Sequence, residues 1–349
     1  MTACAGSGDD GASTATSAAS ASSTDASTTA PSTHAPETTA STGPDTRGTT
    51  SASTGDTTGE PLPPELTVLA SGYPRSRPLV LHGEHVYWGS AGASGGGQGA
   101  ILRVPQAGGE VEVLLDGLDF PFDLALVDDA LFWADFEGGL IGRIDLDTLA
   151  TAIVADGYPG AADIDGDADH VYWIAGDADP RLARAPLGGG AATDLVTGLT
   201  SPSALLVLDE VALILRGGTL NDLASVPKDG GPLTSLAAAG AVPRALTRDA
   251  THAYWVSSGD GAILRRPLAG GAPDTLVQGT LAPFGLAVDD ARLYWTSTQG
   301  SVHHAAKTGG APELLVDGLM RPERIALGPA HVFFTDFDAG ELLRVGKPP

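Results

Sequence analysis

Pairs of large apolar residues recur along this chain at intervals near 40 residues, and this spacing constrains the fold more than any other feature. Counted on the second residue of each pair, the successive steps are 45, 40, 42, 40, 40 and 39 residues. A regular interval of this size indicates seven copies of one structural unit. The pairs are Tyr87-Trp88, Phe132-Trp133, Tyr172-Trp173, Ile214-Leu215, Tyr254-Trp255, Tyr294-Trp295 and Phe333-Phe334.

Each unit is predicted to contain four short strands. In the stretch 284–322 the predicted strands are 286–288, 292–297, 301–306 and 313–316. Gly309-Gly310 lies between the last two strands, where glycine can adopt positive φ in a tight turn. Four-stranded units with a period near 40 indicate an all-β fold, a single β-propeller of seven blades. Six blades are the alternative, because the repeat around Ile214-Leu215 lacks the aromatic pair.

The two ends of the repeat region complement each other. The last repeat stops near Val345, after its third strand, whereas residues 65–70 match the fourth strand at 313–316. An N-terminal strand that completes the last blade would remove two exposed sheet edges. We therefore expect the ring to be closed by this strand.

The first 61 residues differ sharply in composition from the rest of the chain. Residues 2–61 contain no Val, Ile, Leu, Phe, Tyr or Trp. A segment with nothing apolar to bury cannot offset its ordering entropy, so we expect a disordered Ser/Thr-rich tether at 1–61 and a propeller at 62–349. The chain carries a net charge of -24, which argues against a nucleic-acid partner.

The only cysteine, Cys4, stands at the start of this tether. Met1-Thr2-Ala3-Cys4 resembles the end of a bacterial lipoprotein signal. The 16 Arg against 3 Lys, with abundant Ala and Gly, suggest a GC-rich bacterial genome. The resemblance implies a lipidated Cys4 and display at the bacterial cell envelope or outside the cell, with membrane contact only through the lipid. A free thiol on a secreted soluble protein is the alternative.

Several repeats also resemble a known family of propellers. Phe132-Trp133-Ala134-Asp135 and Phe333-Phe334-Thr335-Asp336 look like degenerate YWTD motifs, as in low-density-lipoprotein-receptor propellers. The run 283–289 resembles the opening of NHL-type and YWTD-type blades. The resemblance spans residues 65–346 and implies the propeller architecture, whereas such propellers serve many unrelated functions.

One acidic run is a candidate metal site. Aspartates two residues apart can supply several oxygens to calcium, but they also cap turns by accepting backbone N–H bonds. We expect turn capping, with calcium as the weaker interpretation and no other cofactor. His303-His304 occurs in one repeat only, and neighbours on a strand point to opposite faces, so the two rings are not expected to share a metal. The acidic run is Asp163, Asp165, Asp167 and Asp169.

The candidate binding residues follow the proline that precedes each first strand. In a propeller this position lies at the mouth of the central channel, and large or charged residues there are not required by packing. We expect a monomer that binds a protein, a peptide or a polar small ligand without catalysis. The alternative is a metal-dependent, lactonase- or lyase-like enzyme at the channel mouth. The candidates are Phe122, Asp123, Arg244, Phe284, Glu323 and Arg324.

Overall fold

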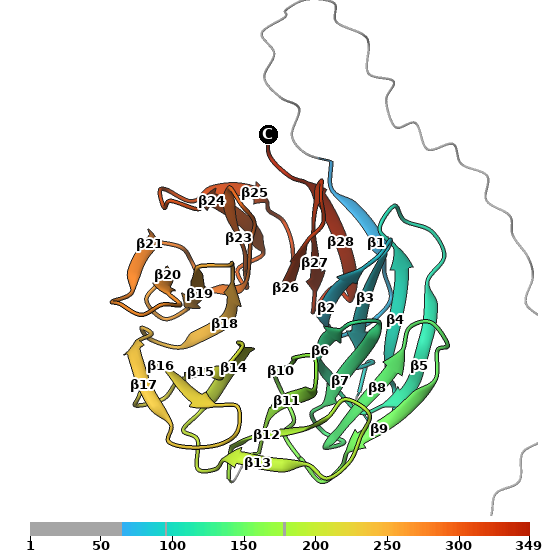
Figure 1. Ribbon diagram of the computed structural model, residues 1–349. Coiled ribbons are helices and arrows are strands. Elements are labelled where there is room, and N and C mark those ends of the chain that lie inside the picture. Colours follow the sequence, from blue (N-terminus) through green and yellow to red (C-terminus); the bar gives the residue numbers. More distant parts are fainter. Residues whose placement is uncertain (1–64, 95, 177–178) are drawn as a thin grey trace, which may run out of the picture. The chain divides into compact units, whose positions relative to one another are not determined.

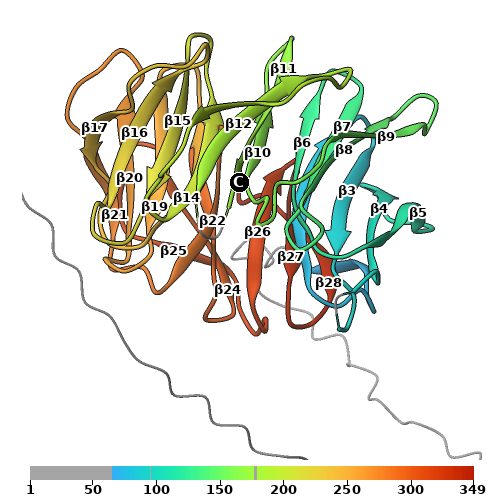
Figure 2. The same ribbon diagram turned by 90° about the horizontal axis from the view of Figure 1, so that it is seen from below.

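The computed structural model describes residues 65–94, 96–176 and 179–349, and these residues form seven four-stranded antiparallel sheets (Figure 1). The sheets are arranged as blades around a central axis, and Figure 2 shows the same ring from the side. The prediction of a seven-bladed propeller is confirmed. The alternative of six is wrong, because β14 to β17 form a complete blade of their own. The tether and Cys4 lie outside the described residues.

Six blades run from the axis outward in chain order, and in the seventh β26 to β28 do so while β1 forms the outer strand. The innermost strands are β2 (Ser76–His82), β6 (Pro121–Val127), β10 (Ile164–Gly166), β14 (Pro202–Val207), β18 (Pro243–Arg248), β22 (Pro283–Val288) and β26 (Pro322–Leu327). The second strands are β3 (His85–Ser90), β7 (Ala130–Asp135), β11 (His170–Ala175), β15 (Val211–Arg216), β19 (His252–Ser257), β23 (Arg292–Ser297) and β27 (His331–Asp336). The third strands are β4 (Gly99–Pro105), β8 (Leu140–Asp145), β12 (Arg181–Pro186), β16 (Asp222–Pro227), β20 (Ala262–Pro267), β24 (Ser301–Ala306) and β28 (Glu341–Gly346). The outer strands are β5 (Glu112–Leu118), β9 (Thr151–Ala155), β13 (Thr193–Val196), β17 (Thr234–Ala238), β21 (Asp274–Gln278), β25 (Glu313–Val316) and β1 (Thr67–Ala70). We number the blades from one (β2–β5) to seven (β26–β28 with β1).

Ring closure follows the predicted route. β1 pairs antiparallel with β28, with Thr67 opposite Arg344 and Val68 opposite Leu343. In Figure 1 the blue strand β1 therefore lies beside the red strand β28. Closure is completed by packing, because Phe333 of blade seven and Trp88 of blade one share one buried cluster. Within the described residues, no helix is long and apolar enough to cross a membrane.

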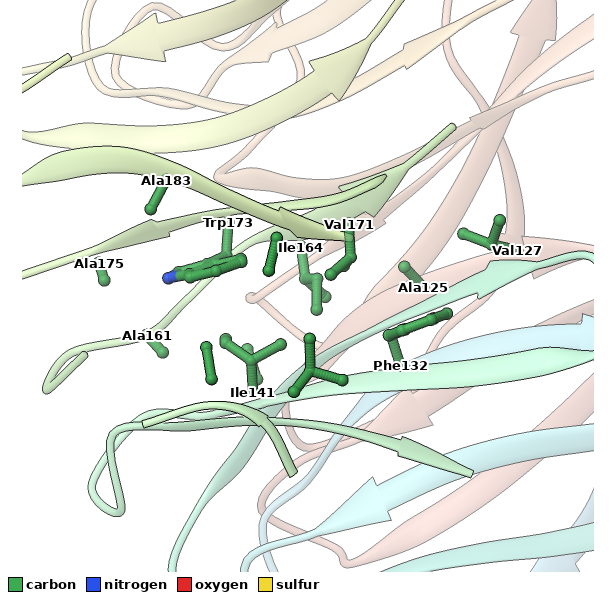
Figure 3. Close-up of a cluster of buried hydrophobic side chains, with 14 of the residues drawn as sticks. Ala125, Val127, Phe132, Ile141, Ala161, Ile164, Val171, Trp173, Ala175 and Ala183 are labelled. Atoms are coloured by element: carbon green, nitrogen blue, oxygen red, sulfur yellow. The ribbon is translucent and has the colours of Figure 1, made fainter. Parts of the chain in front are cut away.

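The paired aromatic residues form the contacts between blades. Successive strand residues point to opposite faces of a sheet, so the two members of a pair face different neighbours. The cluster in Figure 3 shows this arrangement, since Phe132 of blade two packs with Trp173 of blade three, together with Ile141 and Val171. Both rings are fully buried.

The blade without an aromatic pair has aliphatic residues at those strand positions, but they are Leu213 and Ile214. The predicted pair Ile214-Leu215 is wrong by one residue, because Ile214 pairs with Leu205 as Trp173 pairs with Ile164. Ile214 of blade four packs with Tyr172 of blade three, and Leu213 packs with Trp255 of blade five. All four side chains are buried. The interface therefore depends on apolar volume rather than on aromatic character, which is why blade four forms without an aromatic pair.

Truncation tests the closure of the ring. We expect a variant that lacks residues 1–60 to unfold at the same temperature as the full chain, because that segment contains no Val, Ile, Leu, Phe, Tyr or Trp to bury. Removal of residues 1–72 deletes β1 and leaves the outer edge of β28 unpaired, so the melting temperature should fall sharply. Circular dichroism melts of both variants give the comparison. Equal melting temperatures would show that β1 does not hold the ring closed.

Candidate functional site

The predicted binding residues lie where the innermost strands begin, and the strand pairing is irregular there. In β18 the register shifts between Arg244 and Leu246, and in β22 it shifts between Pro283 and Leu286. The inner strands β2, β6, β14 and β26 shift at the corresponding place. A bulge adds a residue and bends the strand, so it frees a side chain from the regular alternation. Six of the seven inner strands thus begin with a bulge that redirects side chains.

These side chains surround a cavity of about 210 Å³, to which all seven blades contribute. We refer to this cavity as the mouth. Four of the six predicted residues line it, namely Phe122, Arg244, Phe284 and Arg324. The structure therefore brings together residues that are as much as 202 positions apart in the sequence, from Phe122 to Arg324.

Phenyl rings and guanidinium groups alternate along the wall of the mouth. The guanidinium carbon of Arg77 lies 3.7 Å from the centre of the Phe122 ring and 5.6 Å from that of Phe284. Arg244 follows on the other side of Phe284, at 5.2 Å. Contacts of this kind stabilise a cation over an aromatic face. They hold the long arginine side chains in place beside the cavity.

The two predicted acidic residues lie behind this wall. Glu323 is 4% exposed, and its carboxylate lies 3.5 Å from Arg77 and 3.1 Å from Arg321. Asp123 lines a second cavity of about 110 Å³, together with Asp163 and Arg324. The prediction that both carboxylates form the recognition surface is therefore wrong for the mouth itself, because the bulged strands turn them toward the arginines.

Arg324 is the charged centre of the channel. Its Nη2 lies 3.3 Å from Asp123 and 3.0 Å from Asp163, so it links blade seven to blades two and three. Each aspartate also accepts a backbone N–H from the following blade, Asp123 from Ile164 and Asp163 from Leu205. These bonds satisfy inner-strand amides that face the channel. The cluster is thus part of the scaffold as well as the floor of the mouth.

Burial shifts the ionisation of this cluster. Burial raises the pKa of Asp123 to about 7, although Arg324 beside it acts in the opposite direction. Burial together with the positive charge of Arg324 lowers the pKa of Arg77 to about 10. Burial also disfavours the charge on Arg324, but Asp123 and Asp163 outweigh it and raise the Arg324 pKa. The arginines therefore stay charged at neutral pH, whereas Asp123 is near its titration midpoint.

The acidic run at 163–169 divides into two roles. Asp167 caps the turn before β11, because it accepts the N–H groups of Asp169 and His170. Asp163 and Asp165 instead accept N–H groups of the next blade, from Leu205 and Val207. Turn capping is thus confirmed for Asp167 and wrong for Asp163 and Asp165. In the described part of the chain, no three acidic, His or Cys side chains come together as a metal site.

Two of the charged residues that line the mouth, Arg77 and Asp163, are not among the binding residues predicted from the sequence. The proline that precedes the first strand of blade three is Pro159, but the chain runs five residues from Pro159 to Ile164 and only three from Pro121 to the equivalent Leu124. The aromatic pair gives the correct alignment, since Ile164 is paired with Trp173 in β11. Counted back from the tryptophan, Asp163 occupies the same place as Asp123.

Comparisons with known proteins support the fold. No family model and no curated protein matches the chain. Among solved structures, virginiamycin B lyase from Staphylococcus aureus matches 82% of this chain and 99% of its own, at 13% identity and a TM-score of 0.67. A catalytically inactive form of that lyase with quinupristin matches 82% of this chain and 100% of its own, at 14% identity and a TM-score of 0.67. The structure of U3-55K matches 81% of this chain and 98% of its own, at 10% identity and a TM-score of 0.65.

These matches correct one expectation from the sequence. The expectation that the chain is not an enzyme is contradicted, because lyases are among the structures that match it over most of its length. At 13% identity the likeness shows the shared propeller and does not transfer the reaction of those lyases. The likeness to YWTD and NHL blades stays an interpretation of the sequence, since no family model matches.

The two arginines of the mouth should differ in their effect on stability. Arg324→Ala removes the partner of two buried carboxylates, so we expect a loss of about 3–5 kcal/mol in the free energy of unfolding. Arg244→Ala removes a side chain without an ion pair among the described residues, and we expect a change within about 0.5 kcal/mol. Urea unfolding of both variants gives the two values. Equal losses would contradict the assignment of Arg324 as the charged centre.

Asp123 should give the protein a measurable dependence of stability on pH. The folded pKa is raised to about 7, so the folded state binds a proton that the unfolded chain has already released. The stability from this group is present below the unfolded pKa of about 4 and is lost as the pH rises through 7. Between pH 4.5 and 8, wild type should lose on the order of 3 kcal/mol more than Asp123→Asn in urea unfolding. Parallel pH profiles would contradict the shift.

Proposed function

We propose that the mouth binds a ligand through an anionic group, such as a carboxylate, and packs a flat apolar part of the ligand against the phenyl rings. Arg244 carries this proposal. It lines the cavity and contacts Phe284, and it has no ion pair among the described residues, whereas Arg77 and Arg324 each have acidic partners. A half-buried guanidinium held beside a cavity is well placed to bind an anion.

The polar atoms of the other two arginines support the same proposal. The Nε atoms of Arg77 and Arg324 are buried and have no hydrogen-bond partner among the described residues. A buried N–H without a partner costs about 1–3 kcal/mol, so a ligand oxygen or a water that accepts from it would be favoured. The cation–π contacts fix the guanidinium groups in advance, which reduces the entropy that binding must offset.

The volume of the mouth limits what can enter it. About 210 Å³ is smaller than the roughly 300–1,000 Å³ typical of pockets for drug-sized ligands. A small aromatic acid, or one acidic side chain of a peptide or protein, has the appropriate size. We therefore propose that a larger ligand inserts only its anionic end.

Benzoate is a direct probe of this proposal. We expect benzoate to bind in isothermal titration calorimetry and uncharged benzamide to bind at least tenfold more weakly, because only benzoate can pair with Arg244. Arg244→Gln should weaken benzoate binding about tenfold or more, equivalent to about 1.4 kcal/mol. Arg266→Gln is the matched control, since Arg266 bonds to Gly271 and Pro267 and does not line the mouth. Equal binding by both variants would place the anion site elsewhere.

Catalysis in the cavity of about 110 Å³ behind the mouth, which Asp123 lines, is a second candidate function, and one observation favours it. A carboxyl group with a pKa near 7, such as Asp123, can both accept and donate a proton at neutral pH. Quinupristin, the compound in one matched lyase structure, is a suitable test substrate. A change in its mass with wild type but not with Asp123→Asn would support a lyase. Unchanged quinupristin with wild type would argue against this substrate.

We also propose display at a bacterial cell envelope through lipidation of Cys4. The motif Met1-Thr2-Ala3-Cys4 and the apolar-free segment that follows support this proposal. In a bacterial host that expresses the natural gene, wild type should fractionate with membranes and Cys4→Ser should become soluble. Recovery of both proteins in the soluble fraction would contradict the anchor.

A further inference from the structure

A third cavity lies along blade six, beside the segment that joins blades five and six, and shares no lining residue with the mouth. It has a volume of about 420 Å³. Thr280 and Leu281, from the segment that joins the two blades, form one side of it, and Ser301 and His303 of β24 form another. Leu314 of β25 also lines it. We refer to this cavity as the groove.

The groove departs from the repeated scaffold at two polar positions. His303 lies opposite Trp295, and the corresponding place in blades one, five and seven is a leucine. Thr280 donates its backbone N–H across the blade as Leu199, Ala239 and Leu319 do. Packing is satisfied by apolar residues at both positions, so the polar residues of this groove are not explained by the fold. The leucines opposite the second-strand residue are Leu102, Leu264 and Leu343.

Ser301 and His303 form a hydrogen-bonded pair in the groove. The Oγ of Ser301 lies 2.8 Å from Nε2 of His303, because residues two apart on a strand face the same side. The imidazole stacks on the Trp295 indole, with ring centroids 5.7 Å apart and an angle of 15° between the ring planes. This stacking fixes the plane of the imidazole. The ring therefore has a hydroxyl on one nitrogen and a rigid surface beneath it.

The ionisation of His303 suits a proton acceptor. Burial lowers its pKa, although a hydrogen bond to the backbone of Glu313 acts in the opposite direction. A neutral imidazole has one nitrogen that carries no proton and can accept one. A hydroxyl, a base within hydrogen-bond reach and a third group that orients the base are the parts of an activated nucleophile.

Thr280 is an independent sign that the groove takes a ligand. It is 7% exposed, and its buried hydroxyl oxygen has no hydrogen-bond partner among the described residues. Leaving a buried hydroxyl unpaired costs about 1–3 kcal/mol. The apolar side chains nearby are accessible, since Leu281 is 74% exposed and Leu314 is 56% exposed. The groove thus has a buried hydroxyl without a partner among the described residues, beside an accessible apolar surface.

We propose that Ser301, with His303 as its general base, is a nucleophile that accepts the acyl group of small apolar esters. Oγ of Ser301 bonds to the ester carbonyl carbon while its proton passes to Nε2 of His303. The bond between that carbon and the alcohol oxygen then breaks, and the alcohol leaves with the proton. Water attacks the acyl-serine by the same route, which releases the carboxylic acid and restores Ser301. Leu281 and Leu314 contact the acyl chain, and the Thr280 hydroxyl bonds to a substrate oxygen.

A fluorophosphonate probe tests this proposal on the propeller itself. We expect one adduct per chain, located on Ser301 by peptide mass spectrometry and absent from Ser301→Ala. His303→Leu places in the groove the residue that three other blades carry, so it should fold while labelling falls at least tenfold. Turnover of p-nitrophenyl butyrate should fall in parallel in both variants. His303→Gln is the second variant if the leucine lowers the melting temperature.

Blade five supplies a matched control. There the hydroxyl of Thr251 lies 2.8 Å from Nδ1 of His252, outside the groove. His252→Gln should leave the labelling of Ser301 unchanged, and Thr251 should carry no adduct. Absence of an adduct on Ser301 in wild type would overturn the proposal. Labelling at the same rate in His303→Leu and His303→Gln would also overturn it, because Ser301 would then react without its base.

Discussion

The packing of one blade against the next is the interaction on which the rest of this structure depends. A four-stranded sheet has two faces, and neither can be left in water when both members of its central pair are large and apolar. A closed ring covers both faces of every blade. Phe132 packs with Trp173 at one interface, and Phe333 packs with Trp88 at the interface that closes the ring. The regular interval in the sequence is the consequence, since each interface requires the same two positions.

The channel mouth is built at the places that this packing leaves free. Repeated positions hold apolar side chains, whereas the bulged beginnings of the inner strands can carry other residue types. Charged side chains at these places meet near the axis, where water is limited, so they interact strongly. Arg324 is held by Asp123 and Asp163, which in turn hold the backbone of the next blades. Arg244 has no ion pair among the described residues, and for this reason we propose it as the group that binds an incoming anion.

The sequence predicts the architecture far better than the sites. Because the same pattern repeats in every blade, a weak repeat can be recognised from its spacing to the others. The blade of Ile214 was therefore predicted although it lacks the aromatic pair. The mouth depends on single residues, and a two-residue difference in the approach to blade three was enough to hide Asp163. The orientation of Asp123 depends on a bulge that strand alternation does not predict. The groove at Thr280 becomes visible only after the blades have been placed side by side.

A crystal structure of the propeller grown with benzoate would test directly whether the mouth is an anion site. We expect density for the aromatic ring beside Phe122 and Phe284, with the carboxylate within hydrogen-bond distance of Arg244. Such a complex would also show whether the buried Nε atoms of Arg77 and Arg324 acquire a partner. A ligand-free mouth at saturating benzoate, or a benzoate bound away from all three arginines, would contradict the account.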